Sequence, residues 1–353
     1  MSGSVYDDYE DEYDDEAPRR SGIWSHLTAI SSWIVTLAAL ALGAAFLLII
    51  DTQRPGPAAP DGAAQTTIVV PRGVGIAAIG QHLEAENVIR SGLAFRAGVM
   101  IYGRGRSLKA GEYSIPSGAS SAAIIEKLTA GRVVLHPITV PEGWTSAMIT
   151  DALAASEFLD GETPAPPAEG TLLPETYRFE RGVSRAEVLR EMQDASSKTL
   201  KELWASRQAG LPLKSPREAL ILASVVEKET GVASERPRVA AVYVNRLRKG
   251  MRLESDPTVI YGVSQGRPLG RGILQSELDR DTPYNTYRRY GLPPTPIANP
   301  GRASIEAVLN PAKTNDLFFV ADGTGGHAFA TNVADHNRNV ARWRSLERAR
   351  GSQ

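Results

Sequence analysis

The sequence contains no cysteine among its 353 residues. Disulfide bonds, thiolate metal sites and cysteine nucleophiles are therefore excluded, and a chain of this length needs no covalent cross-links to hold a core. The five histidines are dispersed without a pair at ligand spacing, so we expect neither a metal site nor a cofactor. A Gly-x-Ser-x-Gly motif, which would indicate a serine hydrolase, is also missing.

Charge is absent from residues 23–50, which contain no Asp, Glu, Lys or Arg. About 20 apolar residues cross a bilayer as a helix, so this segment predicts a single transmembrane helix. A cleaved signal peptide is the alternative, but the long apolar run and the acidic segment before it argue against one. Because Arg19 and Arg20 precede the helix, we expect residues 1–22 in the cytoplasm and everything after residue 51 outside it.

The remaining charge is unevenly distributed. Residues 1–22 carry eight acids and two arginines without an apolar period, which predicts a disordered tail or, alternatively, a docking segment for a cytoplasmic partner. A net charge of −1 then leaves about +5 on residues 51–353, a mild excess that suits an anionic polymer. Residues 51–65 are rich in Pro, Ala and Gly and predict a linker, and residues 347–353 predict a short C-terminal tail.

Residues 66–160 repeat one pattern three times, an apolar residue followed by Pro-x-Gly at Gly73, Gly118 and Gly143. Ala, Ile and Leu follow each glycine at the same offsets, so each copy predicts a strand, a tight turn and an amphipathic helix. These are small modules of an α+β fold. The first copy also matches the dinucleotide motif G-x-G-x-x-A, but no acid follows at the required distance, and we expect neither nucleotide nor nucleic-acid binding.

A larger mixed α/β domain is predicted over residues 161–346. Its helices are expected at residues 185–208, 216–231 and 235–249, the last of them with Ser234 as N-cap. The stretch from residue 251 is rich in Pro, Gly, Asn and Tyr and predicts ordered loops. A short strand at Leu317–Val320 and a helix from residue 333 complete the prediction.

Glu229 is the strongest catalytic candidate. On the predicted helix it shares a face with Leu222, Val225 and Val226. A carboxyl on an apolar face has a raised pKa, which is the state that a general acid needs near neutral pH. The alternative is a structural carboxylate paired with an arginine such as Arg246.

The opposite face of that helix carries Glu227, for which we expect a smaller role. The loops after residue 250 concentrate hydroxyls, amides and aromatic rings, the groups that bind sugars, and the Pro-rich run 291–301 is suited to wall a groove. The predicted glycan-binding residues are Glu175, Asn245, Asp256, Thr258, Tyr261, Tyr284, Asn285, Thr286 and Tyr287.

Three blocks, residues 222–262, 281–301 and 318–337, resemble the membrane-bound endolytic murein transglycosylases. The resemblance covers roughly residues 68–345, including the first module, which is similar to a glycan-binding LysM domain in that family. It implies that Glu229, the second Glu of a Glu-Lys-Glu-Thr run, is the essential acid, with Thr230 after it.

The same resemblance implies a lyase of peptidoglycan glycan strands in the bacterial cytoplasmic membrane. Such an enzyme cuts nascent strands near the synthesis machinery and ends their elongation, so peptidoglycan synthases are candidate partners. Two alternatives stay open. One is a hydrolytic muramidase with Glu175 or Asp256 as the second carboxylate, and the other is a non-catalytic scaffold that binds the wall.

Overall fold

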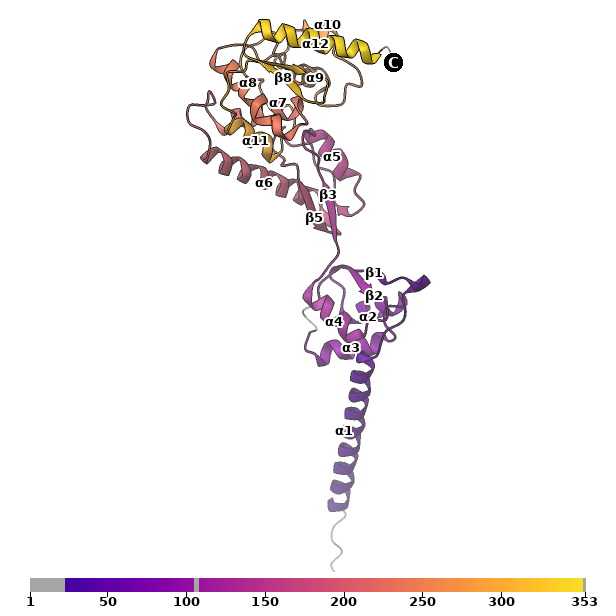
Figure 1. Ribbon diagram of the computed structural model, residues 1–353. Helices are drawn as coiled ribbons and strands as arrows, with labels where there is room; N and C mark the ends of the chain where they lie inside the picture. Colours follow the sequence, from indigo (N-terminus) through magenta and orange to yellow (C-terminus); the bar gives the residue numbers. More distant parts are fainter. Residues whose placement is uncertain (1–22, 105–107, 352–353) are drawn as a thin grey trace, which may run out of the picture. The chain divides into compact units, whose positions relative to one another are not determined.

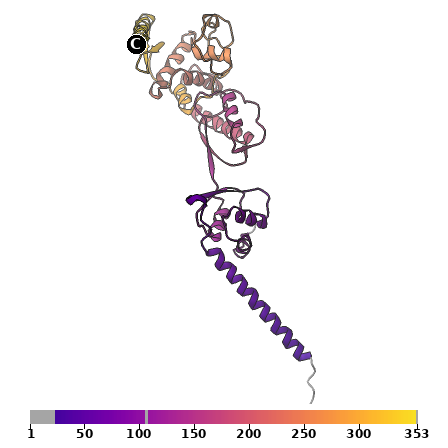
Figure 2. The ribbon, with the colours of Figure 1, turned by 90° about the vertical axis from the view of Figure 1, so that its right-hand side faces the viewer.

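The computed structural model describes residues 23–104 and 108–351, and only the backbone of residues 23–26, 350 and 351. The acidic tail predicted for residues 1–22 lies outside this part of the chain. The chain divides into two compact units, one ending at Val133 and the other beginning at Val134 (Figures 1 and 2). Each unit has its own hydrophobic core.

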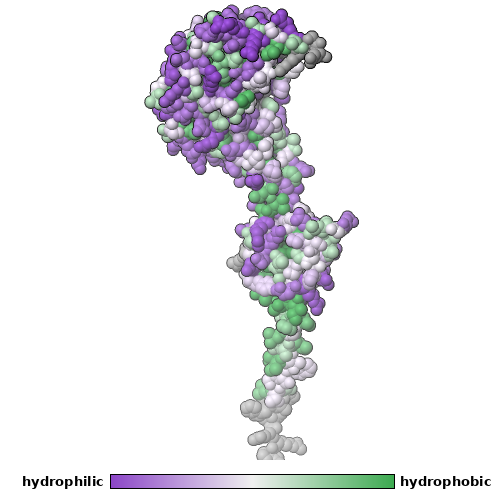
Figure 3. All heavy atoms as spheres, in the orientation of Figure 1, coloured by the Kyte–Doolittle hydropathy of each residue, from purple (hydrophilic) through white to green (hydrophobic). Residues whose placement is uncertain are grey.

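The first element is the long helix α1 (Ile23–Gln53). Its segment Leu27–Gln53 has a mean hydropathy of 2.6 over its most apolar stretch and none of that stretch is buried in the protein. Figure 3 shows hydrophobic residues along this helix. An exposed apolar helix of 27 residues is long enough to cross a bilayer. The predicted span is therefore one continuous helix that fits a single-pass membrane anchor, and it continues three residues past the predicted end at residue 50.

The first unit continues with a two-stranded sheet and three short helices. Strands β1 (Gln65–Val70) and β2 (Gly111–Pro116) pair antiparallel from Gln65↔Pro116 to Val70↔Gly111. The helices are α2 (Ile76–Ala85), α3 (Gly92–Ile101) and α4 (Ser121–Ala130). Their buried faces meet the sheet around Phe95, Tyr113 and Leu128, which are fully buried.

The segment predicted as a linker, residues 51–65, packs on this unit. The backbone N–H of Gly56 donates to the carbonyl of Gly118 at 3.1 Å, and the N–H of Ala59 donates to Ser117 Oγ at 2.9 Å. A short 3₁₀ turn, Pro60–Gly62, follows before β1. The Pro/Ala/Gly composition thus reflects tight turns against the module rather than a free spacer.

The threefold Pro-x-Gly pattern forms the predicted turns. Gly73, Gly118 and Gly143 have φ values of 76°, 73° and 75°, a left-handed conformation that glycine adopts without a Cβ penalty. Each turn joins a strand to a helix, and the Ile and Leu six and ten residues later are buried in all three copies. The repeat is therefore a structural unit, as predicted.

The third copy belongs to the second unit. Strand β3 (Leu135–Thr139) leads through the Gly143 turn into α5 (Ser146–Ala154), and β3 pairs antiparallel with β5 (Thr176–Glu180). The short strands β4 (Leu159–Asp160) and β6 (Val183–Ser184) pair in parallel. Because this pairing crosses the predicted boundary at residues 160 and 161, the compact second unit begins about 27 residues earlier than predicted.

The second unit has two core clusters. One lies between the β3–β5 sheet, α5 and the start of α6 (Arg185–Ala205). The other is helical and is formed mainly by α6, α7 (Pro216–Glu229), α8 (Arg236–Arg248) and α11 (Arg302–Leu309). Of the predicted helices, 185–208 and 216–231 end two or three residues early, and 235–249 is preceded by a 3₁₀ turn, Ala233–Glu235, so that Ser234 is not its N-cap.

The stretch from residue 251 contains more regular structure than predicted. Besides α11 it forms α9 (Asp256–Ser264) and α10 (Gln275–Leu278). Strands β7 (Phe318–Ala321) and β8 (His327–Ala330) pair as a hairpin, which includes the predicted strand. The predicted C-terminal helix is α12 (Val333–Gly351), and it extends through most of the residues expected to form a tail.

Candidate active site

Helix α7 fixes the position of Glu229. Ser215 caps its N-terminus by accepting a hydrogen bond from the N–H of Glu218, and Pro216 occupies the first turn. Residues 219–226 are all buried, so the helix is held on every side. The helix ends at Glu229 because Thr230 is extended, with its hydroxyl accepting from the N–H of Val232.

The Glu229 carboxyl accepts two hydrogen bonds at one oxygen. Tyr243 Oη on α8 donates to Oε1 at 2.7 Å, and Ser255 Oγ, just before α9, donates to the same atom at 2.5 Å. Both donors are buried. The second oxygen, Oε2, accepts no hydrogen bond from any residue that the structure describes. Oε2 is therefore the oxygen of this carboxyl that remains available for a further hydrogen bond.

Burial raises the pKa of Glu229 above the ordinary value for a glutamate. The hydrogen bonds from Ser255 and Tyr243 act in the opposite direction, while the nearby charge of Asp256 adds to the increase. The pKa of Tyr243 is also raised, first by burial and then by Glu229, so its hydroxyl remains a donor. The site thus holds a carboxyl that stays protonated to a higher pH than an ordinary glutamate does.

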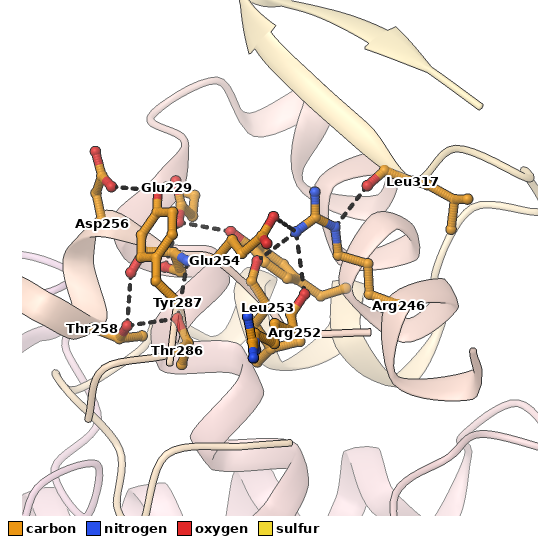
Figure 4. Close-up of polar contacts among 12 residues, drawn as sticks. Glu229, Arg246, Arg252, Leu253, Glu254, Asp256, Thr258, Thr286, Tyr287 and Leu317 are labelled. Atoms are coloured by element: carbon orange, nitrogen blue, oxygen red, sulfur yellow. Dashed lines mark hydrogen bonds and ion pairs between the residues drawn. The ribbon is translucent and has the colours of Figure 1, made fainter. Parts of the chain in front are cut away.

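Arg246, the structural partner considered for Glu229, binds elsewhere. Its guanidinium donates to Glu254 at 2.9 Å, to the carbonyl of Leu317 at 2.7 Å and to that of Leu253 at 3.0 Å (Figure 4). These bonds attach the loop before α9 to α8 and to the strand β7 region. No arginine among the described residues pairs with Glu229. The alternative of a structural ion pair at Glu229 is therefore not supported by its contacts.

The loop that carries Ser255 is held by two buried threonines. Thr286 Oγ1 accepts from the N–H of Ser255 at 3.0 Å, and its hydroxyl lies 2.8 Å from that of Thr258. Beside them, Tyr287 Oη donates to Asp256 Oδ1 at 2.6 Å, and Figure 4 shows Asp256 and Tyr287 next to Glu229. Burial, with Asp256 next in effect, raises the pKa of Tyr287.

Three of the residues predicted to contact glycan are therefore supports. Thr258, Thr286 and Asn285 are fully or almost fully buried. Asn285 Nδ2 donates to the carbonyls of Leu278 and Arg280 at 2.8 and 2.7 Å, which fixes the loop after α10. These three side chains are enclosed in this structure and hold the loops, whereas direct contact with glycan was expected of them.

Tyr261 and Tyr284 lie together at the other side of α9. Their ring centroids are 4.9 Å apart, and Tyr284 Oη is 2.8 Å from Thr295 Oγ1. Tyr261 lines a cavity of about 460 Å³. The cavity is also lined by Glu142, Gly143, Trp144, Thr145, Met148, Lys228, Pro257, Ile260, Gly266, Arg267, Pro268 and Ile297. Lys228 and Pro257 adjoin Glu229 and Asp256 in the chain, but neither of these two carboxyls is among the residues that line the cavity.

Glu169 is a buried carboxyl that the sequence did not single out. Its Oε1 accepts from the N–H of Ser146 at the start of α5 at 2.9 Å, while Oε2 is buried without a partner among the described atoms. Burial raises the pKa of Glu169 to about 7. Burial raises the pKa of Tyr261 to about 12, with the charge of Glu169 as the next cause.

Two predicted residues lie outside this constellation. Asn245 donates to the carbonyls of Thr314 and Asp316 at 2.9 and 3.0 Å and so holds the segment before β7. Glu175 is exposed beside the β3–β5 sheet, where its carbonyl accepts from the N–H of Val140. Neither is among the groups that affect the pKa of Glu229.

Glu227 also differs from expectation. Its side chain is only 4% exposed, and its two oxygens accept from Arg236 at 3.3 Å and from the N–H of Gly301 at 2.8 Å. Arg236 in turn pairs with Glu142 in the Gly143 turn. Glu227 therefore ties together three segments of the second unit, and its role is in stability.

The chain is similar to proteins of known family. Residues 68–342 match the YceG-like family. A protein named endolytic murein transglycosylase from Bacillus subtilis (strain 168) is 32% identical over 330 residues, which cover 85% of this chain and 90% of the relative. A protein of the same name from Streptococcus pneumoniae serotype 2 is 30% identical over 369 residues, and the match spans 90% of this chain and 65% of that longer relative. A crystal structure of a yceG-like protein from Listeria monocytogenes shares 30% identity with a TM-score of 0.49, covering 78% of this chain and 98% of that one.

Proposed function

Because the chain belongs to the YceG-like family, we propose that it is an endolytic murein transglycosylase, a lyase that cleaves the glycan strands of peptidoglycan. The observation that supports this most directly is the carboxyl of Glu229, held at one oxygen by Tyr243 and Ser255 and without a hydrogen-bond partner at the other among the residues that the structure describes. An acid in this setting can both donate and recover a proton.

In the proposed reaction the substrate supplies its own nucleophile. Glu229 protonates the glycosidic oxygen between MurNAc and GlcNAc, and the bond from MurNAc C1 to that oxygen breaks. The ionised carboxylate, stabilised by Tyr243 and Ser255, then takes the proton of the MurNAc C6 hydroxyl, whose oxygen bonds to C1. The product is a 1,6-anhydro-MurNAc end, water is not consumed, and Glu229 is again protonated. Holding both reacting groups in one sugar gives a proximity advantage over water.

The remaining parts of the chain fit a role close to the membrane. The cavity beside Tyr261 would hold sugars that flank the cleaved bond, and the module after the anchor, within the predicted LysM-like and repeat region of residues 66–160, would bind the strand further along. With α1 in the cytoplasmic membrane, cleavage would occur on nascent strands and end their elongation, next to peptidoglycan synthases as candidate partners.

Asp256 favours one alternative. A hydrolytic muramidase uses a second carboxylate to activate water, and Asp256 is close enough to raise the pKa of Glu229. Glu175, the other candidate for that role, lies outside the site. Mass spectrometry of the products from purified full-length protein separates the functions, because anhydro ends are lighter than reducing ends by one water. Binding without any cleavage would indicate a scaffold instead.

Ser255→Ala should move the alkaline limb of the activity profile to higher pH. Activity requires the protonated Glu229 and falls as pH rises through its pKa, and the Ser255 hydrogen bond lowers that pKa by favouring the carboxylate. A hydrogen bond to a charged group contributes about 1.5–3 kcal/mol, so we expect the limb to move by roughly one to two pH units. Ser264→Ala, on the same helix α9, is the control and should leave the limb in place. A limb that does not move in Ser255→Ala would show that Glu229 does not set it.

The orientation in the membrane gives another prediction. With the tail of residues 1–22 inside, protease added to intact spheroplasts should digest the chain beyond Gln53 and leave an N-terminal tag intact. The physical reason is the pair Arg19 and Arg20 before an uncharged span. Loss of the tag with protection of the large unit would reverse the proposed topology.

A further inference from the structure

Helix α3 exposes a row of large apolar side chains. Leu93, Met100 and Ile101 are 68%, 58% and 46% exposed, whereas Phe95 and Val99 on the other face are fully buried. Leu93 and Met100 are seven residues apart, so they lie two turns apart on one side of the helix, with Ile101 beside them. Large apolar side chains exposed on one side of a helix are typical of an interaction surface.

The end of α1 is joined to this same helix. Gln53 Nε2 donates to Tyr102 Oη at 2.8 Å, and Thr52 Oγ1 lies 3.3 Å from the same hydroxyl. Thr52 is fully buried against Gly98, where a Cβ would come within 2.9 Å of the Thr52 methyl group. The close approach of α1 to α3 therefore depends on a residue without a side chain.

If α1 spans the bilayer, this junction brings the C-terminal end of α3 to the height of the lipid headgroups. Ile50, the last apolar residue of the uncharged span, is three residues before Gln53, which corresponds to about 5 Å along a helix axis. The headgroup layer on each side of the hydrocarbon core is about 5–8 Å thick. Tyr102 and the C-terminal end of α3 are thus held at the level where amphipathic helices and aromatic residues contact a bilayer surface.

We propose that the exposed face of α3 is a second membrane contact, with Leu93, Met100 and Ile101 inserted into the headgroup region of the leaflet where α1 ends. Arg96 is exposed at the edge of this face, one turn before Met100, where it can approach lipid phosphates. The anchor alone leaves a protein free to tilt and rotate about its helix. Two contacts hold the first unit at a fixed height and orientation on the membrane, whatever reaction the second unit carries out.

The absence of native cysteine makes a direct test practical. Single cysteines at Leu93 and Met100 of the full-length chain, each labelled with a fluorophore, are compared in nanodiscs of phosphatidylglycerol and phosphatidylcholine. The quencher is a nitroxide on the lipid headgroup or near the top of the acyl chain. The control is a cysteine at Val69, which is exposed on β1 of the same unit. We expect several-fold stronger quenching at positions 93 and 100 than at position 69.

A second variant addresses whether the apolar face causes the contact. The fluorophore is attached to Leu93→Cys, and Met100→Ser and Ile101→Ser are introduced together. Quenching of the label should then fall to the level of the control at position 69. The melting temperature should not change, because both substituted side chains are exposed. Quenching at position 93 that equals the control in the unmodified chain would overturn the proposal. The proposal would also be overturned if neither the lipid nitroxides nor a water-soluble quencher reached the label at position 93. That result would show that this face of α3 is covered by protein and not by lipid.

Discussion

Glu229→Gln should reduce glycan cleavage by about 10²–10⁴-fold or more while the melting temperature changes little. Glutamine keeps the shape of the side chain and can still accept the hydrogen bonds from Tyr243 and Ser255, but it cannot donate and recover a proton. The measurement is the initial rate of strand shortening with purified full-length protein, together with its thermal transition.

Glu227→Gln is the matched control, two residues away on the same helix. The substitution weakens the ion pair between residue 227 and Arg236. Because the Glu227 side chain is only 4% exposed, the main effect should be on stability. Cleavage per folded molecule should remain near that of the unchanged protein. Equal losses of activity in both variants, or unfolding of Glu229→Gln, would show that Glu229 is structural.

Asn299→Ala should lower the free energy of unfolding of the second unit by about 2–4 kcal/mol. Asn299 lies far from Glu229 in the sequence. Its buried side chain accepts from the N–H of Leu172 at 3.0 Å and donates to the carbonyl of Trp144 at 3.0 Å and to Ser146 Oγ at 3.2 Å. Truncation leaves a buried N–H without a partner. At about 2–4 °C per kcal/mol for a unit of this size, the melting temperature should fall by roughly 5–15 °C.

Asn337→Ala serves as the comparison for that change, because Asn337 is exposed on α12. Its melting temperature should stay within about 2 °C, as surface substitutions rarely exceed 0.5 kcal/mol. If Asn299→Ala and Asn337→Ala have the same melting temperature, the hydrogen bonds of Asn299 do not hold the Gly143 turn against the helical core.

Patterns with a short period could be predicted from the sequence. The three Pro-x-Gly turns depend on local backbone conformation, and the positive φ of Gly73, Gly118 and Gly143 follows from residue type. The uncharged span and the amphipathic helices could be predicted for the same reason, because each depends on residues that are close together in the sequence. The helical face that carries Glu229 was identified correctly as apolar, but α7 is buried all round, so the same argument did not reveal that Glu227 is enclosed as well.

The environment of Glu229 could not be predicted, because its donors come from other elements. Tyr243 is 14 residues and Ser255 26 residues further along the chain, and no periodic pattern links them to α7. The same holds for Glu169, whose burial depends on the packing of α5. In the loops after residue 250, composition indicated hydroxyl and amide groups but not their direction, and Asn285 and Thr286 turn inward to satisfy buried backbone.

The proposed reaction makes one claim that a single measurement tests directly: the nucleophile is the MurNAc C6 hydroxyl and not water. Digestion of glycan strands in H₂¹⁸O, followed by mass spectrometry of the released muropeptides, reads this out for the full-length protein. The account predicts 1,6-anhydro-MurNAc ends without heavy oxygen, formed by the unchanged protein and absent with Glu229→Gln. Reducing MurNAc ends that carry ¹⁸O would contradict it, and would assign the activation of water to a second carboxylate, with Asp256 the one beside Glu229.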